Sequence, residues 1–184
     1  LVDAAKVNPD LLLCLDNAQG EQLVKSNDDS LTTVSERDFY QKAIGGTEKY
    51  VSDVILAKTT GKLMVVISTP VRDMNNKIAG VLQANIQLDK ITDYVTQLSQ
   101  EGSSVYILSR QRTVLAHPNT EYVQNQEDFS SLEFTSEYTG EDVTLRTKNI
   151  TGDEVIVSYN TNELSGWMIV VETPVKSAMS SVYK

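Results

Sequence analysis

The sequence predicts an α+β fold made of two tandem modules, each built on an antiparallel sheet with flanking helices. Short runs of β-branched, aromatic and aliphatic residues recur along the 184 residues, separated by turn residues at the spacing of an antiparallel sheet. One run with helical spacing interrupts them near the middle of the chain. The motif that ends the first half also returns at the end of the second, which indicates a repeated unit.

The first half of the chain is predicted to form five strands. Residues 11–15 and 21–25 flank a polar turn over residues 16–20, and the glycine that ends this turn is typical of a hairpin. Three more strands are expected, over residues 50–57, 63–69 and 78–88.

A short helix is expected across this sheet, over residues 35–44. Ser35 and Asp38 have the spacing of a capping box, and Gly45-Gly46 would stop the helix.

A connecting helix is predicted next, because residues 88–98 carry apolar side chains at helical spacing: Leu88, Ile91, Val95 and Leu98. The β pattern then begins again, with strands expected over residues 104–108, 113–116, 132–138, 143–147, 154–159 and 167–172.

The repeat sets the expected domain boundaries. The run VVISTPV at residues 65–71 corresponds to IVVETPV at residues 169–175. The first hairpin corresponds to residues 105–116. We therefore expect the end of an N-terminal helix, a first module, a connecting helix, a second module and the start of another helix, over residues 1–9, 10–87, 88–100, 101–175 and 176–184.

Composition excludes some functions. A net charge of −9 with scattered basic residues argues against a nucleic-acid partner, since such binding relies on clustered Lys and Arg. Cys14, the single cysteine, lies in an apolar run and is interpreted as a small buried hydrophobe. No run reaches the roughly 18–20 apolar residues that span a bilayer. Because the chain lacks an initiator Met and closes on what looks like an unfinished helix, we interpret it as an excised fragment.

Enzyme motifs are missing, so we expect no catalytic residue, metal or other cofactor. The sequence has no phosphate-binding glycine loop, GxSxG or HExxH, and its single histidine, His117, has no second histidine with which to bind a metal. The tripeptide His117-Pro118-Asn119 is interpreted as a turn that ends a strand. A carboxylate pair acting on a sugar stays open, but no spacing singles one out.

One segment has the chemistry of a ligand site. Arg37 stands beside Phe39 and Tyr40, and a planar fork of donors with an apolar wall and a phenol suits a small carboxylate. The alternative is a surface arginine on an amphipathic helix whose aromatic side chains pack it down. The residues alone favour that alternative.

Five segments in order resemble the double Cache sensor regions of bacterial methyl-accepting chemotaxis receptors and sensor histidine kinases: residues 35–40, 50–55 with 59–62, 65–71, 80–82 and 116–119. The resemblance covers nearly the whole chain. It implies two PAS-like modules in line, periplasmic or extracellular, held by flanking membrane helices and a long N-terminal helix that are largely missing here. It also implies a small-molecule partner (a carboxylate or an amino acid) in the membrane-distal module, a homodimer in the full-length receptor, and no catalytic activity.

Carried over by position, the resemblance implies a pocket in the first module, lined by Arg37, Phe39, Tyr40, Ser52, Asp53, Ile55, Ala57, Ser68 and Asn85. Arg37 would hold the ligand carboxylate, the aromatic side chains would cover it, and Asp53 or Asn85 would contact its other end.

The chain departs from the amino-acid-binding version of this pattern at five positions. Phe39 stands where that pattern has a tryptophan, and Thr32 and Ile55 stand where it has tyrosines. Ala57 and Asn85 stand where it has aspartates. A buried ammonium without an anionic partner costs about 3–5 kcal/mol. These substitutions favour a hydroxy or keto acid over an amino acid, unless Asp53 points into the pocket.

We therefore expect the ligand-sensing domain of a transmembrane chemoreceptor. The sensor region of a histidine kinase, an amino-acid sensor, and a structural or adhesion module with no ligand are the alternatives.

Overall fold

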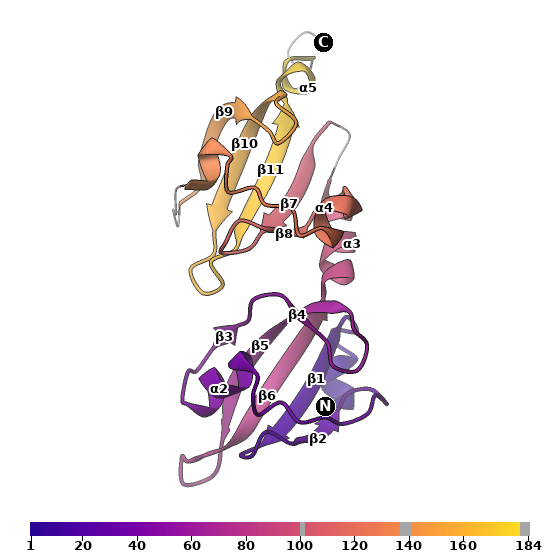
Figure 1. Cartoon of the computed structure of the whole chain (residues 1–184), viewed down its shortest axis with the longest axis vertical. Helices are drawn as coiled ribbons and strands as arrows, with labels where there is room; N and C mark the ends of the chain where they lie inside the picture. The colour runs from indigo at the N-terminus through magenta and orange to yellow at the C-terminus, as the bar shows by residue number, and fades with distance from the viewer. Residues whose placement is uncertain (100–101, 137–140, 181–184) are drawn as a thin grey trace. The chain divides into compact units, whose positions relative to one another are not determined.

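The computed structural model describes residues 1–99, 102–136 and 141–180. The chain forms two compact units, Leu1–Gln87 and Leu88–Lys184. Each contains an antiparallel sheet with few helices, as Figure 1 shows. The predicted α+β fold with two tandem modules is confirmed.

The first unit is built on a six-stranded sheet. Its strands are β1 (Leu11–Asn17), β2 (Gln22–Lys25), β3 (Tyr50–Val51), β4 (Ile55–Leu56), β5 (Leu63–Arg72) and β6 (Ile78–Gln87). They pair antiparallel in the order β2-β1-β6-β5-β3, with β4 also beside β5. The short helix α1 (Val2–Ala5) precedes β1.

The predicted hairpin between β1 and β2 is confirmed. Gly20 has a φ of 82°, and a Cβ atom there would lie 2.6 Å from the Cα atom of Ser35, so only glycine fits. The side chain of Asn17 accepts hydrogen bonds from the backbone N–H groups of Gln19 and Glu21, both at 2.9 Å, and closes the turn.

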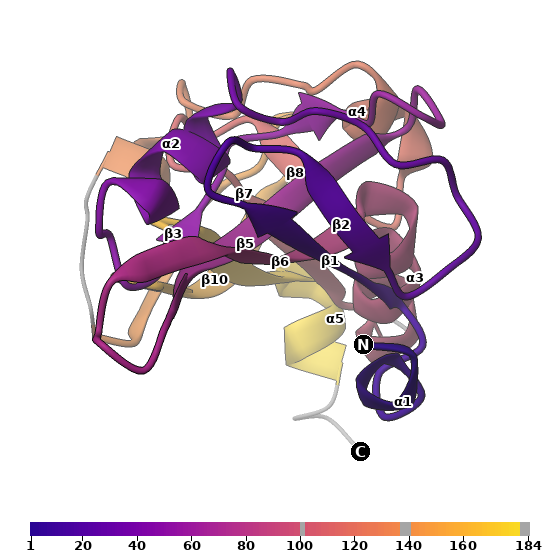
Figure 2. The ribbon, with the colours of Figure 1, turned by 90° about the horizontal axis from the view of Figure 1, so that it is seen from below.

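Helix α2 (Asp38–Ile44) covers one face of this sheet, and α1 lies on the opposite side (Figure 2). Phe39, Tyr40 and Ala43 are buried, in a cluster with side chains from the sheet. Gly45 is the C-cap residue of α2, and Gly46 has a φ of 100°, a conformation that favours glycine. The predicted helix stop at these two glycines is confirmed.

The predicted capping box is wrong, because α2 begins at Asp38 with Arg37 as its N-cap residue and no side-chain cap. Ser35 is held by the hairpin instead: the backbone N–H of Val34 donates to the Gly20 carbonyl at 2.7 Å and brings Ser35 against that glycine. A tertiary contact has overridden the local helix signal.

The strand predicted over residues 50–57 is interrupted and forms β3 and β4. Ser52 lies between them and exchanges two hydrogen bonds with Val66. Its backbone N–H donates to the Val66 carbonyl, and its Oγ accepts from the Val66 N–H, both at 2.9 Å. The side chain replaces a ladder bond and lets the strand break.

The second unit is built on a five-stranded sheet in the order β8-β7-β11-β10-β9. Its strands are β7 (Ser104–Leu108), β8 (Val114–Ala116), β9 (Val143–Lys148), β10 (Glu154–Thr161) and β11 (Met168–Pro174). Its helices are α3 (Leu88–Leu98), α4 (Thr120–Gln124), the 3₁₀ helix η1 (Glu133–Ser136) and α5 (Val175–Ser180). Helix α3 packs against β7 and β8.

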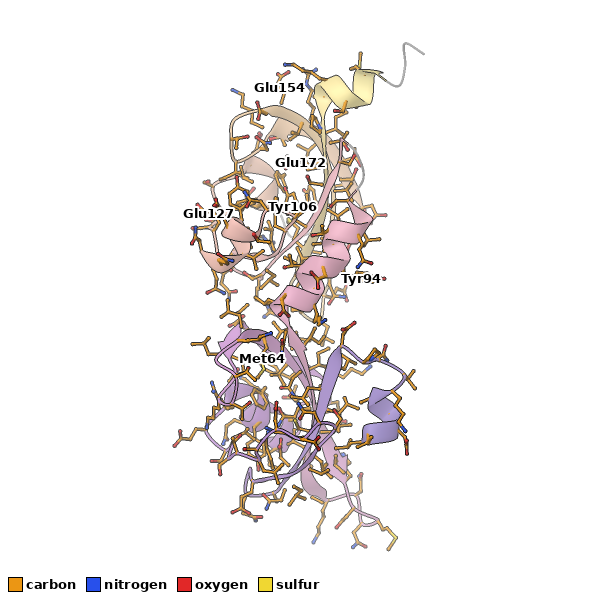
Figure 3. All side chains as sticks on the ribbon, turned by 90° about the vertical axis from the view of Figure 1, so that its right-hand side faces the viewer. Met64, Tyr94, Tyr106, Glu127, Glu154 and Glu172 are labelled. Atoms are coloured by element: carbon orange, nitrogen blue, oxygen red, sulfur yellow. The ribbon has the colours of Figure 1, made fainter. Side chains whose placement is uncertain are left out.

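An aromatic cluster fills part of this unit's core. The ring of His117 lies 5.1 Å from that of Tyr106 and 5.0 Å from that of Tyr122, and Phe129 packs edge-on against both tyrosines. Burial lowers the pKa of His117 to about 4. The Tyr106 hydroxyl donates to Glu172 on β11 at 3.1 Å, and the two side chains lie close together in Figure 3.

The turn predicted at His117 is confirmed, because β8 ends at Ala116. The backbone N–H of Asn119 donates to His117 Nδ1 at 2.8 Å, and the Asn119 side chain accepts from the Glu121 N–H at 3.0 Å. Asn119 thereby caps α4, which the sequence analysis did not predict.

The strand predicted over residues 132–138 is wrong where the structure describes it, because Glu133–Ser136 form η1. Thr135 Oγ1 donates to the Leu132 carbonyl at 2.7 Å, a local bond that competes with strand pairing. Phe134 packs on Tyr159 of β10 at 5.7 Å between ring centroids. Residues 137–138 lie outside the described residues.

Among the helices of the described segments, none combines the length and the apolar composition that a membrane crossing requires.

Candidate ligand-binding site

The sheet face beneath α2 in the first unit, called the covered face below, carries a group of buried polar side chains. Strand register places them together: Cys14 of β1 lies directly opposite Gln83 of β6, and Gln83 lies opposite Ser68 of β5. Buried polar residues of this unit are Asp16 (1% exposed), Lys25 (7%), Ser52 (4%), Ser68 (1%), Gln83 (1%) and Asn85 (5%). Burying so many polar groups is costly unless they meet partners.

Asp16 and Gln83 form the centre of this group. Gln83 Nε2 donates to both carboxylate oxygens of Asp16, at 2.9 and 2.8 Å. Burial raises the pKa of Asp16 to about 6, although the Gln83 hydrogen bond and the charge of Lys25 act in the opposite direction. Among the described residues, no basic side chain forms an ion pair with Asp16.

Lys25 and Asn85 flank this pair. Lys25 of β2 lies opposite Cys14 of β1. The Nζ atom of Lys25 donates to the Ser30 carbonyl at 2.5 Å. Asn85 Nδ2 donates to the Leu12 carbonyl at 2.9 Å and to Cys14 Sγ at 3.5 Å. Burial raises the pKa of the Cys14 thiol to about 11, so the thiol is neutral.

The structure brings four of the sequence-predicted site residues to this group. Phe39 and Tyr40 cover it from α2, each 2% exposed. Ser68 Oγ donates to the Phe39 carbonyl at 2.8 Å, which ties the helix to the sheet. Burial and the charge of Asp16 raise the pKa of Tyr40, whose hydroxyl donates to the Asn17 carbonyl at 3.1 Å. Asn85 is the fourth.

Arg37 is half-buried at the start of α2. Its Nη2 atom donates to the Leu56 carbonyl at 3.2 Å, and nearby Lys58 Nζ donates to the Thr33 carbonyl at 2.6 Å. These two bonds tie the segment before α2 to the region around β4. A guanidinium has five N–H donors, so Arg37 keeps donors for a ligand.

The remaining predicted residues lie along the β3–β4 segment. Ile55 packs against the hydrophobic cluster beneath α2, and Ser52 holds the break between the two strands. Ala57 is half-buried, and its carbonyl accepts from the Gly61 N–H at 2.9 Å in a turn. Asp53 is exposed.

Sequence reasoning missed Asp16, Lys25 and Gln83. Asp16 was placed in the hairpin turn, whereas β1 continues through Asn17. The signal was present: Asp16 follows Leu12 and Cys14 at a spacing of two, which puts all three on one face of a strand.

Two chemotaxis receptors are related to this chain in sequence. The methyl-accepting chemotaxis protein PscA of Pseudomonas syringae pv. tomato is 31% identical over 88 residues, which are 47% of this chain and 14% of that protein. The methyl-accepting chemotaxis protein McpB of Bacillus subtilis is 27% identical over 137 residues, 73% of this chain and 19% of that protein. The chain therefore spans less than a fifth of either relative.

Solved sensor domains share the fold. The extracellular domain rpHK1S-Z16, described as that of a histidine kinase, matches with a TM-score of 0.76 at 17% identity, over 98% of this chain and 77% of that one. The ligand-binding domain of the Campylobacter jejuni chemoreceptor Tlp3, solved with 4-methylisoleucine, matches with a TM-score of 0.72 at 17% identity, over 100% and 73%.

The Cache domain model dCache_1 matches residues 4–182, a range that includes both sheets and the helix α3 between them. This match agrees with the two antiparallel sheets and with the relatives above. The chain belongs to the double Cache domain family.

Proposed function

We propose that this chain is the extracytoplasmic ligand-sensing domain of a transmembrane chemoreceptor, and that its first unit, the membrane-distal one, binds a small organic carboxylate on the covered face. The observation that carries the proposal is the buried polar group around Asp16 and Gln83. Arg37, the N-cap residue of α2, supplies the positive charge. The membership of the Cache family and the two chemotaxis receptors among its relatives support the receptor assignment.

The composition of the covered face supports ligand binding over a purely structural role. Ligand sites combine apolar and aromatic walls with a few convergent polar groups. Phe39 and Tyr40 supply the wall, and Ser68, Gln83 and Asn85 supply hydrogen-bonding groups from two adjacent strands. A core that served packing alone would be filled with apolar side chains, because buried polar groups cost free energy.

Arg37 supplies the charge for a carboxylate. A guanidinium pairs with a carboxylate through two parallel hydrogen bonds, which gives both strength and orientation. Because Arg37 is bound to only one described carbonyl, that of Leu56, ligand binding does not require breaking an ion pair. Tlp3, which shares this fold, was solved with an amino-acid derivative that carries a carboxylate.

A thermal-shift screen of small carboxylates tests the proposal. A compound that binds only the folded state raises the midpoint of unfolding by mass action. We expect at least one hydroxy, keto or amino acid to raise the midpoint, and Arg37→Ala to abolish the shift. If no carboxylate shifts the midpoint, or if the shift persists in Arg37→Ala, the proposed site is wrong.

A histidine kinase is the second candidate for the full-length protein, favoured by the structural match to the rpHK1S-Z16 extracellular domain. In either receptor, we propose that a conformational change passes out of the second unit through the segment from β11 into α5 (Val175–Ser180).

A further inference from the structure

A cavity of about 500 Å³ lies in the second unit, between the segment that leads into η1 and the edge strand β9. Residues 131–133, residues 146–149 and Glu154 line it. Figure 3 labels Glu154, the first residue of β10, at this end of the second sheet. Small-molecule sites typically have volumes of about 300–1,000 Å³. The cavity is therefore large enough for a small ligand.

The cavity occupies a place that hydrogen bonds bridge in the first unit. β9 is an edge strand of its sheet, as β3 is in the first, and in each unit this strand follows a short helix, η1 or α2. In the first unit, Arg37 and Lys58 donate to backbone carbonyls across the corresponding space. In the described part of the second unit, no hydrogen bond joins residues 131–133 to residues 146–149, and the space stays open.

Two cationic side chains of the lining come from the same side of β9. Arg146 and Lys148 are two residues apart and both exposed, in a strand whose burial alternates along its length. Two residues of a strand span roughly 7 Å, so these side chains can engage two separate anionic groups. Within the part of the chain that the structure describes, the Lys148 side chain has no hydrogen bond and no ion pair.

The acidic side chains of the lining leave both cations available. Arg146 pairs with Glu154, but these side chains are 61% and 59% exposed. Because exposed ion pairs add little stability, a ligand carboxylate can replace Glu154 at little cost. Glu133, the other carboxylate of the lining, is exposed at the start of η1, so it can remain in water.

Asn149 gives the cavity one fixed wall. Its Oδ1 atom accepts from the backbone N–H groups of Thr151 and Asp153, at 3.1 and 2.9 Å. Its Nδ2 atom donates to Glu172 of β11 at 2.9 Å. The side chain is thus held from two directions, and the cavity keeps its shape at this end without a ligand.

We propose that the second unit binds a small dicarboxylate in this cavity, with one carboxylate at Arg146 and the other at Lys148. Ser131 and Thr147 also line the cavity and carry hydroxyl groups that can donate to the ligand oxygens. A compound with a single carboxylate engages only one of the two cations and binds weakly. This preference distinguishes the cavity from the site proposed for the first unit.

Succinate and succinamate, which differ only in a carboxylate against an amide, test the proposal by calorimetric titration. Arg37→Ala is the starting chain, because it lacks the site proposed for the first unit. We expect succinate to bind this chain and succinamate to bind at least about 10-fold more weakly. Adding Lys148→Gln should weaken succinate binding by a similar factor. Adding Glu133→Gln should tighten it, because a like charge near the ligand is removed.

Arg110→Gln, added to the same starting chain, is the matched control. It removes an exposed cation of the same unit that contacts the Leu164 carbonyl, beyond the end of β10 opposite to Glu154, and should leave succinate affinity unchanged. If succinate binds only the unmodified chain, it binds in the first unit and the proposal is overturned. No succinate binding to either chain, equal binding of succinamate, or unchanged succinate affinity after Lys148→Gln overturns it as well.

Discussion

Gln83 Nε2 bridges the two carboxylate oxygens of Asp16, at 2.9 and 2.8 Å, and joins two buried polar side chains that are 67 residues apart in sequence. The bond crosses from β6 to β1 on the covered face. Because neither side chain is apolar and both are almost fully buried, this contact is a costly way to build a core. It has measurable consequences for stability as well as for binding.

Asp16→Asn should stabilise the protein at alkaline pH. Burial raises the pKa of Asp16 to about 6, above its ordinary value of 3.8, so the folded state favours the protonated acid. The stabilising contribution is present below pH 3.8 and is lost as the pH rises through 6. We expect the variant to gain up to about 3 kcal/mol in unfolding free energy at pH 8 and nothing at pH 3.5. Urea unfolding at both pH values measures this, and a constant difference would contradict it.

His117→Phe should remove an acid sensitivity of the second unit. Burial lowers the pKa of His117 from 6.5 to about 4, so its stabilising contribution is present above pH 6.5 and is lost as the pH falls toward 4. The loss amounts to about 2–3 kcal/mol, and phenylalanine keeps the aromatic contacts with Tyr106 and Tyr122. Trp167, the single tryptophan, reports unfolding of this unit by fluorescence. An equal acid sensitivity in the variant would show that other groups cause it.

Gly80→Ala should disrupt the pairing of β1 with β6. A Cβ atom on Gly80 would lie 2.2 Å from the Asp16 carbonyl oxygen, so the two backbones would have to separate. We expect a loss of about 3 kcal/mol in unfolding free energy together with weaker ligand binding. Gly61→Ala is the control: it has a φ of 65° but open space around it, and should cost about 1 kcal/mol without affecting binding. Similar losses in both variants would mean that crowding at Gly80 is not decisive.

The fold was largely predictable because strand alternation and turn glycines are local signals. The hairpin at Gly20 and the stop after α2 are positions where a single residue type satisfies the backbone. One error arose where a contact between distant segments decided the structure, and another where a local side-chain hydrogen bond did. Ser35 lies against Gly20 in place of capping α2, and Thr135 bonds to a local carbonyl in place of pairing as a strand.

The candidate site was predictable only in part. Phe39 and Tyr40 follow from helical packing, and their burial agrees with that expectation. The Asp16–Gln83 pair depends on the register between β1 and β6, and a shift of one residue would have sent Asp16 to the other face. No local pattern fixes that register across so long a separation.

Calorimetric titration of Arg37→Ala tests the central claim most directly, using the carboxylate that most stabilises the unmodified chain. The matched control is Arg72→Ala, which removes an exposed arginine of the same unit that pairs with Glu48. We expect Arg37→Ala to lose about 2–5 kcal/mol of binding free energy, because it removes one charged partner of a desolvated pair, and Arg72→Ala to bind normally. Unchanged affinity in Arg37→Ala would contradict the account.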